Sequence, residues 1–198
     1  MAQLSFYSAD ANPPARGDLA GLLCGPARLV SFGGVTARLS VPVADAWRGH
    51  ALKRALADRG VDATLYTAGD GLLLRTAFRR DLTALAAAWT AGDGKTIPAG
   101  LVLAGAALRL WVLAAGDWTD TGYVLRLDPL AADTHETLTK SVTACGLPVT
   151  PYNAEGDGPG LRIFGRRRLA RLAELVGRPP SAAAESHWPA GSRVRQTA

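Results

Sequence analysis

Apolar residues alternate with polar ones over residues 36–41, where Ala37, Leu39 and Val41 take every second position. This period of two is typical of a strand with one buried face. Beyond it, apolar residues recur at helical spacing, at Trp47, Ala51, Leu52, Ala55 and Leu56. A second helical stripe comprises His135, Leu138, Val142 and Cys145. The pattern predicts half-buried strands interspersed with amphipathic helices in both halves of the chain.

The two halves of the chain repeat one another. Arg38-Leu39-Ser40-Val41 matches Arg126-Leu127-Asp128-Pro129, and each half has a Gly-Asp-Gly turn, at residues 69–71 and 156–158. Each turn is followed by a strand with one arginine, Arg75 or Arg162, and then by a helix. The matching residues lie 86 to 88 positions apart. A repeat at a fixed distance predicts one supersecondary unit used twice.

The unit reads as αββαββα, which predicts an α+β fold of two tandem repeats that form a pseudo-dimer with two antiparallel sheets. The predicted organisation is an N-terminal arm (1–17), a first repeat (18–91), a linker (92–99), a second repeat (100–178) and a flexible tail (179–198). The arm and the tail are assigned from their Pro-rich, aperiodic sequence.

Each repeat opens with an apolar segment, at residues 18–23 and 100–115. A helix that is apolar on all sides has to be buried on all sides. Small residues such as Gly21 and Ala107 allow two such helices to approach closely, which predicts a central helix pair between the two sheets.

Composition narrows the class of protein. Lysine and arginine number 22 against 17 acidic residues, and the net charge of +5 favours an acidic partner such as nucleic acid. Two cysteines, Cys24 and Cys145, are too few for a disulfide framework or a four-cysteine zinc site. The N-terminus does not have the pattern of a secretory signal, and Arg109 interrupts the longest apolar run. We expect a cytoplasmic, nucleoid-associated protein with no cofactor.

Leu19-Ala20-Gly21-Leu22-Leu23 resembles the opening of a LAGLIDADG helix, and the repeated unit is similar to that fold over about residues 18–178. The chain also resembles the WhiA family of bacterial transcription regulators. Three segments carry this second resemblance: Leu4–Ser8, Leu113–Asp120 and Asp93–Pro98. WhiA proteins continue into a helix-turn-helix domain, whereas the tail here has no such pattern.

The LAGLIDADG resemblance implies a carboxylate at the eighth position of each motif helix, where two acids hold divalent metal for phosphodiester cleavage. These positions are Pro26 and Ala115, neither of which ligates magnesium. Moving the second register by one residue would bring Asp117 to the eighth position, but no shift rescues the first. We therefore expect no metal site and no catalysis, with an endonuclease that uses Asp117 as the alternative.

In the fold that the chain resembles, the two sheets form a saddle along duplex DNA. Strand alternation then turns Thr36, Arg38 and Ser40 toward the saddle, and likewise Val124, Arg126 and Asp128. The predicted DNA-binding residues are Arg38, Ser40, Thr64, Tyr66, Arg75, Arg126, Tyr152, Arg162, Arg166, Arg167 and Arg168. The competing interpretation is that these arginines only solvate an exposed face.

Three functional hypotheses follow. The first is a catalytically inactive, WhiA-like regulatory protein, a monomer that binds double-stranded DNA through its saddle, mostly by phosphate contacts. The second is a protein-interaction adaptor for a partner transcription regulator, for which Trp188 in the tail is a candidate contact. The third is the metal-dependent endonuclease that uses Asp117.

Overall fold

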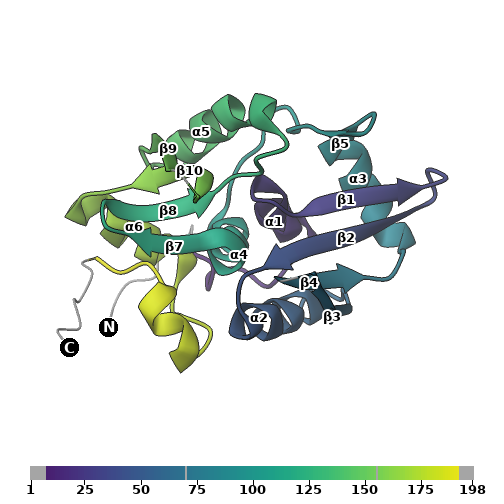
Figure 1. The fold of residues 1–198 in the computed structure, drawn as a ribbon, viewed down its shortest axis with the longest axis horizontal. Coiled ribbons are helices and arrows are strands. Elements are labelled where there is room, and N and C mark those ends of the chain that lie inside the picture. The colour runs from purple at the N-terminus through teal and green to yellow at the C-terminus, as the bar shows by residue number, and fades with distance from the viewer. Residues whose placement is uncertain (1–7, 70, 155, 192–198) are drawn as a thin grey trace.

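A computed structural model describes residues 8–69, 71–154 and 156–191 and confirms the two αββαββα repeats (Figure 1). The first repeat comprises η1 (Arg16–Leu19), α1 (Ala20–Cys24), β1 (Arg28–Phe32), β2 (Thr36–Val43), α2 (Ala46–Ala57), β3 (Ala63–Ala68), β4 (Gly71–Thr76), η2 (Arg80–Leu82) and α3 (Thr83–Trp89). The second comprises α4 (Gly105–Ala115), β7 (Gly116–Thr119), β8 (Gly122–Arg126), η3 (Ala132–Thr134), α5 (His135–Ala144), β9 (Thr150–Ala154), β10 (Gly158–Ile163) and α6 (Arg166–Val176). A two-stranded ribbon of β5 (Thr90–Ala91) and β6 (Gly94–Lys95) lies between the repeats, and η4 (Ala182–His187) follows them.

The two four-stranded sheets have the same antiparallel topology, with strand orders β1-β2-β4-β3 and β7-β8-β10-β9. On β2 the alternation is as predicted, because Ala37, Leu39 and Val41 are buried while Thr36, Arg38 and Ser40 are partly exposed. Helices α1 and α4 lie between the two sheets (Figure 1). The apolar face of each sheet therefore packs inward, and its other face is left for the solvent or a partner.

The central helix pair depends on a close approach at Gly21. A Cβ atom at this position would overlap the carbonyl oxygen of Ala107 on α4, so only glycine fits. Helix α4 begins at Gly105, five residues later than the predicted apolar segment. No helix within residues 8–69, 71–154 and 156–191 is long and apolar enough to cross a membrane.

The prediction of a flexible tail is wrong for residues 182–188, because Ala182–His187 form η4, which packs against α2 of the first repeat and β7 of the second, and Trp188 follows it. Trp188 is only 4% exposed, and its indole Nε1 donates to the carbonyl oxygen of Gly177 at 2.8 Å. The guanidinium of Arg109 lies 5.1 Å from the centre of its ring. Trp188 is therefore a core residue of this chain and not a free contact for a partner. Contacts of this kind have no periodicity, which is why the sequence did not reveal them.

The N-terminal arm is also attached to the second repeat. Ser8 is buried, and the backbone N–H of Ala9 donates to the carbonyl oxygen of Leu175 at 2.8 Å. Residues 4–7, which carry part of the resemblance to WhiA, lie outside the described residues.

Candidate nucleic-acid interface

The outward faces of the two sheets together form the surface that we call the saddle. In the first sheet, Ser40 pairs with both Arg28 and Arg75, and Arg75 also pairs with Thr64. Residues paired directly across antiparallel strands point to the same side of the sheet. By the same rule Arg38 and Tyr66 share this side with Ser40. The five residues predicted on this half of the saddle therefore all lie on one face.

The second sheet presents its predicted residues in the same way. Gly160 pairs with both Arg126 and Tyr152, and Arg162 pairs with Thr150. A groove of about 710 Å³ follows this face. Its walls are Asp117, Trp118, Thr119, Asp120, Thr121, Arg126, Pro151, Tyr152, Asn153, Ala154, Asp157 and Arg162.

In the first half of the saddle, Arg38 and Arg75 have no anionic partner among the described residues, whereas Arg28 on the edge strand is paired with Asp128. The buried Nε atoms of Arg38 and Arg75 have no hydrogen-bond partner in the part of the chain that the structure describes. Strands β1 to β4 contain neither aspartate nor glutamate. The Arg38 guanidinium lies 4.5 Å from the centre of the Phe78 ring, which holds it on the face without neutralising its charge. This half therefore carries uncompensated positive charge.

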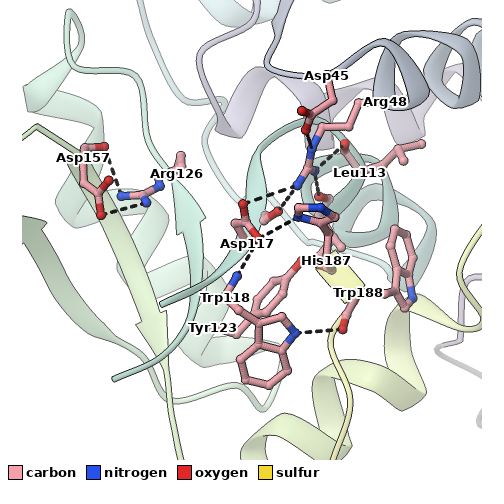
Figure 2. Close-up of polar contacts among 12 residues, drawn as sticks. Asp45, Arg48, Leu113, Asp117, Trp118, Tyr123, Arg126, Asp157, His187 and Trp188 are labelled. Atoms are coloured by element: carbon pink, nitrogen blue, oxygen red, sulfur yellow. Dashed lines mark hydrogen bonds and ion pairs between the residues drawn. The ribbon is translucent and has the colours of Figure 1, made fainter. Parts of the chain in front are cut away.

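In the second half, Arg126 is already paired with a carboxylate. Its Nη2 lies 3.1 Å from Asp157 Oδ2, and its Nη1 donates to the carbonyl oxygen of Asp157 at 3.0 Å (Figure 2). The Tyr152 hydroxyl donates to the same carboxylate at 2.9 Å. The hydrogen bonds from Tyr152 and Arg126 lower the pKa of Asp157, so it remains ionised at neutral pH. The charge of Arg126 is thus largely used within the protein.

The predicted equivalence of Arg38 and Arg126 is wrong. The cross-strand row Thr64–Arg75–Ser40 corresponds to the row Thr150–Arg162–Val124. Two residues further along the second strand of each sheet, Arg126 matches Pro42 and not Arg38. The loops between the strands differ in length in the two repeats, so a nearly constant distance in sequence does not preserve the register within the sheets.

The predicted outward exposure of Val124 and Asp128 is also wrong, since both are buried. Val124 is on the expected face, but it is the central residue of its row, between Asp117 of β7 and Arg162 of β10. Asp128 lies beyond the end of β8 at Arg126, where strand alternation no longer sets the direction of a side chain.

Asp128 instead joins the two repeats at the end of helix α1. Its Oδ2 lies 3.1 Å from Arg28 Nη2 and 3.0 Å from Lys95 Nζ, and Lys95 Nζ also donates to the carbonyl oxygen of Gly25 at 2.6 Å. Burial raises the pKa of Asp128, but the hydrogen bond from Lys95 and the nearby charges outweigh this effect. The pKa of Asp128 is therefore lowered. Burial lowers the pKa of Lys95 by more than Asp128 raises it. A cation of the linker ribbon therefore satisfies the carbonyl end of α1.

Arg48 of α2 has the corresponding role at the end of α4, and it is 3% exposed. It donates to the carbonyl oxygens of Leu113 at 3.0 Å and Gly116 at 2.7 Å (Figure 2). It also pairs with Asp45 at 3.3 Å and lies 3.9 Å from Asp117 Oδ2. Sequence reasoning missed both cations. The one local signal was the spacing of Asp45 and Arg48 across a helix N-terminus.

Asp117, the acid of the alternative nuclease hypothesis, is also in contact with His187, through its other carboxylate oxygen. His187 Nδ1 lies 3.1 Å from Asp117 Oδ1, and the His187 ring lies 5.5 Å from that of Trp47 (Figure 2). The Tyr123 hydroxyl donates to the carbonyl oxygen of His187 at 2.9 Å. In the part of the chain that the structure describes, no three His, Cys, Asp or Glu side chains are grouped to hold a metal ion.

Arg166, Arg167 and Arg168 open helix α6, as predicted. The first two are exposed, whereas Arg168 lies 5.1 Å from the centre of the Phe164 ring. Arg162 of the saddle lies 5.2 Å from the same ring. Phe164 therefore links this basic cluster to the second half of the saddle.

Comparisons with known proteins agree with this architecture. No protein-family profile matches the sequence, and no curated protein does. The fold is similar to that of the homing endonuclease I-WcaI bound to its DNA recognition sequence, with a TM-score of 0.63 and 15% identity over 86% of this chain and 84% of that one. It is similar to the N-terminal LAGLIDADG domain of DUF199/WhiA, with a TM-score of 0.59 and 9% identity over 92% of this chain and 96% of that one. A variant of the homing endonuclease I-DmoI in complex with its target DNA has a TM-score of 0.51 and 12% identity over 81% of this chain and 93% of that one.

The chain has the LAGLIDADG fold. Each of these likenesses lies below 25% identity, so they establish the architecture of the chain and not its activity.

Proposed function

We propose that the chain binds double-stranded DNA along the saddle without cleaving it, in a regulatory role. The observation that carries the proposal is the pair Arg38 and Arg75, which are partly exposed on the outward face of a sheet whose strands contain no acid. Guanidinium groups that no carboxylate neutralises are suited to phosphate oxygens. The other predicted contacts, from Ser40 to Arg168, line the same saddle or adjoin it.

The comparisons support this choice of ligand. The similar structures of I-WcaI and I-DmoI were solved with DNA, and the similar WhiA domain has the fold without being described as an endonuclease. A WhiA-like regulatory role is the finer part of the proposal. It rests on that likeness and on the segments that resemble WhiA in the sequence.

The proposed absence of cleavage rests on the ends of the two motif helices. Pro26 and Ala115 stand where the fold calls for metal-binding acids, and both adjoin carbonyl groups that Lys95 and Arg48 already occupy. Asp117 is engaged by Arg48 and His187. Magnesium would have to displace these cations before it could bind, so we expect no magnesium-dependent nicking of supercoiled DNA.

The decisive experiment is a titration of fluorescent duplex DNA by anisotropy over a series of salt concentrations. We expect log K to fall with log salt by about 0.9 for each phosphate neutralised. R38E/R75E should weaken binding about 100-fold at low salt, because it replaces two phosphate contacts with repulsion. The matched control is K53E/R54E, which makes the same change in net charge on exposed positions of α2, behind the sheet.

The control variant should bind within about twofold of the wild type, since its changes are far from the saddle. Equal weakening by both double variants would show that only net charge matters and would overturn the assignment to the saddle. A binding constant that does not depend on salt would overturn DNA binding itself. In that event the adaptor hypothesis is the alternative, and nicking that requires Asp117 would establish the nuclease hypothesis.

A further inference from the structure

The first half of the saddle exposes large apolar side chains beside its arginines. Phe32 is 69% exposed and Val30 is 48% exposed, both on strand β1. Phe78 is 41% exposed, and its ring centre lies 5.8 Å from that of Phe32. Single exposed apolar residues are common on protein surfaces, but a cluster on a binding face indicates a contact surface.

The register places this cluster on the face that carries the free arginines. Val30 pairs with Arg38, and Phe32 pairs with Thr36, across the β1–β2 hairpin. The hairpin extends away from the central helices, at the edge of the molecule (Figure 1). Its outward face therefore combines apolar groups with Arg38, a cation that has no carboxylate partner among the described residues.

We propose that the β1–β2 hairpin recognises thymine in the major groove of duplex DNA through Val30 and Phe32, while Arg38 contacts the backbone beside it. This inference rests on the proposed function and adds sequence preference to it. The major groove admits a two-stranded β-ribbon, and the thymine C5-methyl group is the apolar feature that it displays. The arginines favour an anionic partner with an apolar element over a purely apolar protein surface.

The corresponding hairpin of the second repeat has different chemistry. The outward residues of β7 are Asp117 and Thr119, and the one apolar residue that faces them on β8, Val124, is buried. A carboxylate at this place repels phosphate and offers nothing to a methyl group. Recognition of thymine is therefore assigned to the first hairpin alone.

The inference is tested with two DNA duplexes of equal length, one of alternating A·T pairs and one in which deoxyuridine replaces every thymidine. Uracil lacks only the C5-methyl group, so the charge, the minor groove and the base pairing are unchanged. We expect the wild-type chain to bind the A·T duplex at least about threefold more tightly, the factor that corresponds to burial of a methyl group.

The variant V30S/F32S should bind the two duplexes equally and keep the salt dependence of the wild type. The control V102S/L130S removes two other exposed apolar side chains, 84% and 79% exposed, and should keep the preference. Equal binding of both duplexes by the wild type, or a preference that survives in V30S/F32S, would overturn the inference while DNA binding stands.

Two further outcomes are distinct from these. Tighter binding of single-stranded oligothymidine than of either duplex would overturn the inference in favour of base stacking on Phe32. No salt-dependent binding to any of these nucleic acids would overturn the proposed function itself, and the exposed hairpin would then be assigned to a protein partner.

Discussion

In the first sheet, Arg38 and Arg75 face outward with no carboxylate on their strands, whereas in the second sheet Arg126 is bound to Asp157. The two sheets have the same strand order and corresponding rows of residues. Their outward faces nevertheless differ in charge, because acids are present on only one of them. The comparison shows that a duplicated scaffold can keep its strand order while its two exposed faces differ in charge.

Two ion pairs also connect the repeats, and in each the cation belongs to the first repeat and the acid to the second. Arg28 of the first repeat binds Asp128 of the second, and Arg48 of the first lies beside Asp117 of the second. Arg28 on β1 and Asp117 on β7 stand at equivalent positions of the two sheets, so one repeat has a cation where the other has an acid. The outward faces can therefore differ without leaving buried charges uncompensated at the centre.

The largest effect on stability is expected at Asp128, an acid of the second repeat that pairs with Arg28 of the first repeat and Lys95 of the linker ribbon. Replacing Asp128 with Asn leaves Lys95 buried with a weaker partner, and we expect a loss of roughly 3 kcal/mol in the free energy of unfolding. Urea denaturation measures this loss. D133N, at an exposed acid on η3, is the control and should stay within about 0.5 kcal/mol.

The same residue gives the pH dependence its sign. The pKa of Asp128 is lowered in the folded state, so its contribution to stability is present above its unfolded pKa of about 4 and disappears as the pH falls through the lower folded value. The wild type should lose stability over this acidic range, and D128N should lose less of it. Parallel stability curves for the two proteins would contradict the assignment.

A smaller effect is expected from reversing the arginines of the second half. R126E/R162E should weaken DNA binding only about tenfold, against about 100-fold for R38E/R75E, because Asp157 already neutralises Arg126. The measurement is the same anisotropy titration at one salt concentration. Equal losses for the two double variants would mean that the two halves contribute equally to DNA binding and that the Arg126–Asp157 pair does not reduce the contribution of Arg126.

The smallest expected effect is a gain in DNA affinity when Arg126 of the second half is freed from its acid. D157N removes the carboxylate that holds Arg126, so the freed guanidinium should tighten DNA binding by about threefold. D58N, at an exposed acid at the end of α2, makes the same change in charge behind the first sheet and should leave affinity nearly unchanged. An unchanged or weakened affinity in D157N would show that Arg126 acts only together with Asp157.

Much of the fold could be predicted from local pattern. Alternation on residues 36–41 gave the correct faces of β2, and the small residues at Gly21 and Ala107 predicted the close helix pair. These features depend on neighbouring residues, so sequence periodicity carries them. The direction of Arg38, Arg75 and Arg162 followed from the same rule.

The remaining features depend on distant residues. Lys95 and Arg48 reach helix ends that are far from them in sequence, and Trp188 is buried by contacts with α4 and Gly177. Arg126 was predicted correctly to face the saddle, but its pairing with Asp157 across a hairpin has no local signature. Register was the other failure, because loop lengths that differ between the repeats shift Arg126 away from the place of Arg38.

The cations at the helix ends also decide whether acids at Pro26 and Ala115 could form a metal site. Introducing aspartate at both positions would set each new carboxylate beside Lys95 or Arg48, which already bind the adjoining carbonyl groups of Gly25 and Gly116. The acids would then form ion pairs with these side chains instead of a metal site. Removing the cations as well would leave buried carbonyl groups without donors and would cost stability. A two-carboxylate metal site at these helix ends would thus require at least four coordinated substitutions, and the single steps toward it would lower the stability of the chain.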